Sequence, residues 1–202
     1  MIPALAKVYI PLLGSVTAAL WPTMPDRPTL AAQIEQETCA SLTSKKCWNP
    51  KAELKTSREY GFGLGQLTVT PQFNNFKAAK GWDRSLAGWE WSDRFDPAMQ
   101  LRALVAYDRN LYLQVKFAAT PEDRLAFTFS AYNGGLGGVL KDRRMCAAIK
   151  GCNPNVWFGH VERHSFRSKT AVKGYGQSFF DVNRGYVRNI MVIRAVKYRG
   201  LL

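Results

Sequence analysis

Apolar residues recur every three or four positions through most of the chain, the spacing that places them on one face of an α-helix. The alternation of apolar and polar residues that is typical of strands is nearly absent. We therefore predict a mainly α-helical protein with at most a small β-hairpin, placed between residues 55 and 70. The predicted helices, bounded by proline and glycine positions, cover residues 8–21, 29–40, 97–117, 121–133, 136–149 and 182–198.

The last of these helices has a pronounced apolar stripe. Tyr186, Ile190, Ile193 and Val196 share this stripe, and Arg184, Arg188 and Arg194 lie off it. One interpretation is that the stripe packs in the core and the arginines are solvated. The other is that the basic residues bind anionic lipid headgroups while apolar residues insert into the membrane.

The chain has no internal repeat, low-complexity tract or linker, and 202 residues fit a single domain. We predict that an N-terminal helix within residues 1–25 packs on a core of residues 29–190. The apolar stretch at residues 8–21 is too short to span a bilayer, and it lacks the basic start and cleavage site of a signal peptide. Neither a transmembrane segment nor an export signal is therefore expected.

Composition is that of a globular protein, with 47% hydrophobic and 21% charged residues. The net charge of +13 is unusual and predicts attraction to a polyanion, either nucleic acid, an anionic membrane or a bacterial envelope. No nucleic-acid-binding motif accompanies the charge, so nucleic acid is not expected as a partner.

Glu37 is the main candidate for acid–base chemistry. Leu30, Ile34 and Glu37 are spaced i, i+4 and i+7, so they share one helical face. A carboxyl group on a core-facing stripe loses hydration, which raises its pKa and suits it to donate a proton. Glu35 points to roughly the opposite side, and we expect its replacement to have little effect. The structural alternative is that Glu37 is an ordinary boundary residue.

Further motifs follow Glu37-Thr38 in order. Residues 48–52 read Trp-Asn-Pro-Lys-Ala, and residues 57–66 run from Ser57 through a glycine-rich turn to Gln66. Residues 131–135 read Ala-Tyr-Asn-Gly-Gly, and an acidic residue precedes a helical tyrosine by five positions at Asp181 and Tyr186.

Together these motifs resemble those of the lytic transglycosylase and goose-type lysozyme group, and most closely its compact bacteriophage endolysins. The family has Glu-Ser/Thr, aromatic-Asn-Pro-x-Ala, Ser-x-x-Gly-Ala-x-Gly-Leu-Met-Gln and Ala-Tyr-Asn-Ala-Gly. This chain departs from the pattern at Tyr60, Gly61, Gly65 and Gly134, and it has Asp181 where Glu is usual. The resemblance covers residues 29–190, and its strength lies in the order and separation of the motifs.

The resemblance implies a lysozyme-like, two-lobed α fold with Glu37 at a helix end in a cleft. It implies cleavage of the β-1,4 bond between N-acetylmuramic acid and N-acetylglucosamine of peptidoglycan, without metal or organic cofactor. The substrate-binding residues it implies are Ser57, Gly63, Gln66, Tyr132, Asn133 and Tyr186. It also implies a monomeric, phage-encoded enzyme held in the host cytoplasm until release to the cell wall.

Three alternatives concern the chemistry. No second carboxylate accompanies the motifs, which favours a lytic transglycosylase that forms a 1,6-anhydro product. A hydrolase would need a carboxylate to activate water, and the candidates are Asp83, Asp93, Asp96 and Asp181. The third reading is a basic cell-wall-binding or membrane-permeabilising protein.

Four cysteines form two close pairs, Cys39 with Cys47 and Cys146 with Cys152. Two short-range disulfides would form in an oxidising compartment and stay open in a reducing one. The second pair precedes His160 and His164, which offers an alternative zinc ligand set. The sequence leaves these states open.

Overall fold

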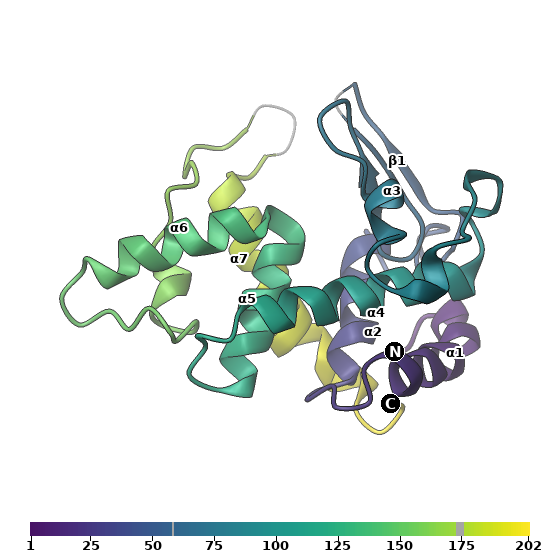
Figure 1. Ribbon diagram of the computed structural model, residues 1–202, viewed down its shortest axis with the longest axis horizontal. Helices are drawn as coiled ribbons and strands as arrows, with labels where there is room; N and C mark the ends of the chain where they lie inside the picture. The colour runs from purple at the N-terminus through teal and green to yellow at the C-terminus, as the bar shows by residue number, and fades with distance from the viewer. Residues whose placement is uncertain (58, 173–175) are drawn as a thin grey trace. The chain divides into compact units, whose positions relative to one another are not determined.

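The computed structural model describes residues 1–57, 59–172 and 176–202, and it is mainly helical as predicted (Figure 1). The chain divides into two compact units. The first unit comprises Met1–Tyr107 and Ile190–Leu202, and the second comprises Asp108–Asn189. Both chain termini therefore belong to the first unit, and the two unit boundaries fall inside helical segments.

The helix boundaries follow local chemistry. Pro28 and Pro121 occupy first turns, where the missing N–H has no intrahelical partner. The Thr120 side chain accepts a hydrogen bond from the Asp123 amide and caps the helix that follows. The α-helices are α1 (Ala4–Leu20), α2 (Pro28–Thr38), α3 (Asn75–Ala79), α4 (Pro97–Gln114), α5 (Pro121–Gly134), α6 (Leu136–Ala147) and α7 (Phe179–Arg188).

The β structure is larger than the predicted hairpin. Strands β1 (Glu53–Lys55), β2 (Tyr60–Phe62) and β3 (Leu67–Val69) form an antiparallel sheet in the order β1-β2-β3. Gly61 is the central residue, paired with Leu54 on one side and Thr68 on the other. Each strand has three residues, too few for a period-two pattern to stand out in the sequence.

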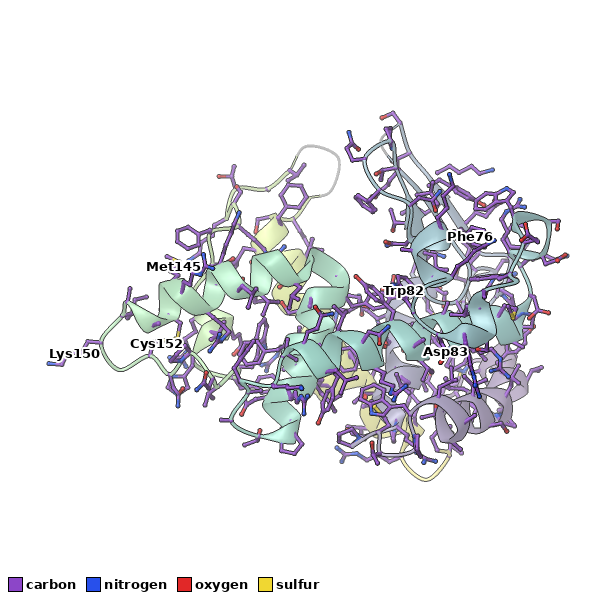
Figure 2. The ribbon with its side chains drawn as sticks, in the orientation of Figure 1. Phe76, Trp82, Asp83, Met145, Lys150 and Cys152 are labelled. Carbon is purple, nitrogen blue, oxygen red and sulfur yellow. A yellow bond between two sulfur atoms is a disulfide. The ribbon has the colours of Figure 1, made fainter. Side chains whose placement is uncertain are left out.

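Aromatic side chains fill part of the first unit's core. The rings of Phe76 and Trp89 lie 4.8 Å apart, and both belong to the buried apolar cluster that includes Phe62. Phe76 is labelled in Figure 2. Residues 82–96 contain the 3₁₀ turns η1 (Arg84–Leu86) and η2 (Trp91–Asp93), and Trp89 between them is buried.

In the second unit α5 packs against both α6 and α7, with the 3₁₀ turn η3 (Val161–Arg163) beside α6. A buried ion pair joins two of these helices, because Arg184 Nη1 lies 2.9 Å from Asp142 Oδ2. Across the described parts of both units, no helix combines the length and the apolar character needed to cross a membrane.

The predicted last helix does not keep one apolar face. α7 ends at Arg188, and the π-helix η4 (Asn189–Arg194) and the 3₁₀ turn η5 (Ala195–Tyr198) follow. Ile190 is buried as predicted, but Ile193 and Val196 are 59% and 55% exposed. Wider and tighter turns rotate the following side chains away from a 3.6-residue stripe, so the core-packing interpretation does not hold for Ile193 and Val196.

Candidate active site

Glu37 lies in the last turn of α2 and is half-buried. Leu30 and Ile34 on the same helix are fully buried, as the predicted stripe requires. Thr38, the next residue, donates from Oγ1 to the Ile34 carbonyl at 2.7 Å and accepts from the Trp48 amide at 2.9 Å. The helix end that carries Glu37 is thus hydrogen-bonded to the aromatic residue of the second motif.

Glu35 does not face solvent, contrary to the expectation that its replacement would have little effect. Its carboxylate is fully buried and accepts hydrogen bonds from Arg194, Lys197 and Tyr198. Burial raises the pKa of Glu35, but the hydrogen bonds from Lys197, Tyr198 and Arg194 outweigh this effect and hold that pKa below its usual value. The error arose because α2 is also covered by η5 on the side where Glu35 lies.

Residues 48–52 join the end of α2 to the glycine-rich turn. The Ala52 carbonyl accepts from the Gly63 amide at 2.8 Å and from Gln66 Nε2 at 3.3 Å. Gln66 Nε2 also donates to the Gly63 carbonyl at 2.8 Å. The side-chain nitrogen of Gln66 therefore binds backbone within the turn, a structural role beside the sugar binding that the resemblance implies.

Gln100 in α4 is a buried residue that the sequence analysis did not single out. Its Nε2 donates to the carbonyls of Pro50 and Arg94, both at 2.8 Å. Its Oε1 accepts from the Leu64 amide at 2.9 Å. Gly63 has a φ of +78°, and a Cβ atom there would lie 2.5 Å from Gln100 Cδ. The space beside this glycine thus holds Gln100.

Ser57 lies in the loop between β1 and β2 and is exposed. It belongs to the first unit, together with Glu37, Gly63 and Gln66.

The other three predicted site residues belong to the second unit. The rings of Tyr132 in α5 and Tyr186 in α7 are nearly parallel, with centroids 6.4 Å apart. Tyr186 is buried and Tyr132 is half-buried. Asn133 is exposed, and its Oδ1 accepts from Asn183 Nδ2 at 3.0 Å.

Asn183 is a second residue that the sequence analysis missed. It is buried in α7, donates from Nδ2 to the Ser130 carbonyl at 3.0 Å and accepts from Ser130 Oγ at 2.8 Å. This exchange ties α7 to the turn of α5 that carries Tyr132 and Asn133. Asn183 belongs to no motif. Its only signal in the sequence is its position two residues after Asp181.

Three of the four carboxylates considered for a hydrolase accept hydrogen bonds at the start of a helix. Asp83 Oδ1 accepts from the Ser85 amide at 2.9 Å, and hydrogen bonding from Ser85 holds the pKa of Asp83 below its usual value. Asp96 Oδ1 accepts from the Met99 amide at 2.8 Å where α4 begins. Asp181 pairs with the capping residue of α7, Ser178, and Asp93 lies exposed within η2.

Both cysteine pairs are disulfides, Cys39–Cys47 and Cys146–Cys152. Cys152, labelled in Figure 2, lies in the loop after α6. Neither thiol of this pair is free to bind zinc, and His160 Nδ1 accepts from the Asn153 amide at 3.0 Å. Within the described residues, no three His, Cys, Asp or Glu side chains form a group suited to a metal ion.

Comparison with known proteins supports the family resemblance. The chain is 31% identical over 105 residues to membrane-bound lytic murein transglycosylase F of Vibrio campbellii, which covers 49% of this chain and 19% of that protein. It is 28% identical over 167 residues to the proteins of the same name from Vibrio cholerae and Serratia proteamaculans. Those alignments cover 79% of this chain and 28% and 30% of the respective relatives.

The chain thus spans less than a third of the length of these curated relatives. No family model matches it. The 70 kDa soluble lytic transglycosylase of Escherichia coli aligns with 90% of this chain and 25% of its own, at a TM-score of 0.43 and 16% identity. On the sequence matches, the chain is related to the lytic transglycosylases.

Proposed function

We propose that this chain cleaves the β-1,4 bond between N-acetylmuramic acid and N-acetylglucosamine in peptidoglycan as a lytic transglycosylase. The main support for this proposal is the position of Glu37. It is half-buried at the end of α2, and residues 48–52 connect this helix end to the glycine-rich turn. The motifs and the relationship to lytic murein transglycosylases support the same reading.

In the proposed reaction one carboxyl group acts twice. Glu37 first donates its proton to the glycosidic oxygen, the bond to C1 of the muramic acid breaks, and an oxocarbenium-like state forms. The Glu37 carboxylate then takes the proton of the C6 hydroxyl as that oxygen bonds to C1. The products are a 1,6-anhydromuramic end and a free N-acetylglucosamine hydroxyl, and no water is consumed.

In the first unit, the other predicted site residues would bind the glycan. Gly63 and Gln66 shape the turn next to residues 48–52, and Ser57 stands exposed on the adjoining sheet loop. In the second unit, the predicted glycan-binding residues are Tyr132, Asn133 and Tyr186. The exposed Asn133 amide suits hydrogen bonding to sugar substituents, whereas the buried Tyr186 suits support of Tyr132.

Glu37→Gln should abolish wall cleavage without changing the fold, because the amide keeps the shape of the side chain but cannot donate the required proton. The measurement is product release from purified peptidoglycan, with circular dichroism as the check on folding. Cleavage within tenfold of the unaltered protein would contradict the assignment of Glu37.

Mass analysis of the products distinguishes the readings. Anhydro ends identify a transglycosylase, and reducing ends identify a hydrolase with the same acid. No products would identify a binding protein. The places of Asp83, Asp96 and Asp181 at the starts of helices favour the first outcome, because these carboxylates already accept amide or hydroxyl hydrogen bonds.

We also propose that the protein acts as a bacteriophage endolysin, reaching the wall from the host cytoplasm at lysis. The motif pattern supports this finer assignment, and the net charge of +13 suits an anionic envelope. Cells that express the protein in the cytoplasm should lyse only when the inner membrane is permeabilised. Cells expressing Glu37→Gln should then remain intact, and spontaneous lysis of both would contradict the assignment.

A further inference from the structure

The residues next to Glu37 in the chain are each held by another part of the first unit. Glu35 and Gln36 bond to the C-terminal segment, and Thr38 bonds to Trp48. Cys39 forms a disulfide with Cys47. The last turn of a helix leaves carbonyl groups without intrahelical partners and tends to fray. The contacts of these four neighbours therefore hold the turn that carries Glu37 in one conformation.

Three hydrogen bonds and the backbone of α2 link four buried residues in a ring: Glu35, Thr38, Trp48 and Tyr198. Trp48 donates from its amide to Thr38 Oγ1 at 2.9 Å and from Nε1 to the Tyr198 hydroxyl at 3.2 Å. The Tyr198 hydroxyl donates to Glu35 Oε2, and the backbone of α2 connects Glu35 to Thr38. All four residues are buried, so water does not compete for these bonds.

Two cations compensate the buried charge of Glu35. Lys197 Nζ donates to both carboxylate oxygens, at 2.8 and 3.1 Å. Arg194 Nη1 donates to Glu35, and its Nε donates to Gln36 Oε1 at 2.9 Å. A buried carboxylate is stable only with such partners, so α2 and the C-terminal segment hold one another in one arrangement.

We propose that Glu35 and Tyr198 are positioning residues for Glu37. They set the path of the backbone through the turn from which the Glu37 side chain projects. The proposal rests on the proposed function, in which the Glu37 proton must meet one glycosidic oxygen and then one C6 hydroxyl. Small misplacement of such a group lowers the rate of the chemical step strongly, whereas binding of a long glycan through many other contacts changes little.

The decisive variant is Tyr198→Phe, which removes the shared hydroxyl and keeps the ring in the core. With soluble glycan strands as substrate, we expect kcat to fall about tenfold or more while KM stays within twofold. Glu35→Gln should act in the same direction. An unchanged kcat in Tyr198→Phe, with the protein folded, would overturn the proposal.

Two control variants in α1 separate positioning from stability. Thr17→Val removes another buried hydroxyl, which donates to the Leu13 carbonyl at 2.7 Å, and Leu13→Ala opens a cavity in the same unit. Both should lower the melting temperature and leave kcat unchanged when measured below the transition. A fall in kcat in Leu13→Ala equal to that in Tyr198→Phe would show a general stability effect and overturn the proposal.

The same assay keeps the two levels of inference apart. If the unaltered protein releases no product, or if Glu37→Gln retains its activity, the proposed function fails and the positioning role fails with it. If Glu37→Gln is inactive while Tyr198→Phe keeps full kcat, the proposed function stands and only the positioning role fails.

Discussion

At the scale of single residues, one departure from the family pattern has a local steric reason. Gly134 stands where the family has alanine, and its carbonyl accepts from Arg167 Nη2 at 3.1 Å. A Cβ atom at Gly134 or Gly138 would overlap the Arg167 guanidinium. The glycine therefore leaves room for an arginine that comes from a distant loop. Local spacing does not reveal such a pair, because its partners meet only in the folded chain.

Gly63→Ala tests the same principle in the glycine-rich turn. A left-handed φ costs alanine about 1–2 kcal/mol, and displacing Gln100 would weaken hydrogen bonds that contribute about 1 kcal/mol each. We expect a loss of about 3 kcal/mol in the free energy of unfolding, measured by urea denaturation with tryptophan fluorescence. Gly88→Ala is the control, since Gly88 is exposed and has no neighbour within 4 Å of a Cβ atom. Equal stability of the two variants would contradict this account.

At the scale of elements, the sequence predicted the helices whose apolar residues keep a regular period. In α4, which falls within the predicted helix 97–117, the apolar residues of one stripe are buried: Leu101, Leu104, Val105 and Leu111. The C-terminal segment was mispredicted because a π-helix changes the period in mid-segment, and periodicity assumes a constant one. The Glu35 partners were missed for a related reason: a carboxylate opposite an apolar stripe is usually solvated, and only tertiary packing covers it.

The contact between α2 and the C-terminal segment should depend on pH. The pKa of Glu35 is lowered in the folded protein, so its ionised form contributes stability above its ordinary pKa. That contribution is lost as the pH falls through the lower, folded-state pKa. Glu35→Gln should therefore melt well below the unaltered protein at neutral pH, because Arg194 and Lys197 lose a buried partner. Melting curves over a pH series give the measurement, and a difference that persists undiminished in acid would contradict it.

At the scale of the whole molecule, the motifs predicted the class of protein but not the geometry of its site. Order and separation along the chain singled out Glu37 as a candidate, and residues 48–52 connect its helix end to the glycine-rich turn within the first unit. Gln100 and Asn183 were outside any motif, although they fix the glycine-rich turn and the Tyr132 turn respectively. Buried amides of this kind bond to backbone groups brought close by folding, and spacing in the sequence does not encode that proximity.

The charge of the molecule and its exposed C-terminal residues bear on how it would approach cells. Arg194 and Lys197 bond to Glu35, so reversing Arg194 would damage the fold rather than test lipid binding. What the segment does expose is apolar: Val192, Ile193 and Val196, followed by the exposed Arg199. We expect the protein's net charge of +13 to attract it to an anionic lipid layer, into which these exposed apolar side chains would insert.

Ile193→Ser with Val196→Ser tests this surface without emptying a core position, since both side chains are more than half exposed. We expect unchanged cleavage of isolated wall and reduced killing of intact cells that have an outer membrane, because less apolar surface would insert into the lipid. Leu113→Ser is the control, an exposed apolar residue of α4 in the second unit. Binding of the unaltered protein to anionic vesicles should also weaken as salt rises, since the charges attract through water. Equal activity of the double variant and the unaltered protein on both substrates would show that this segment only supports α2.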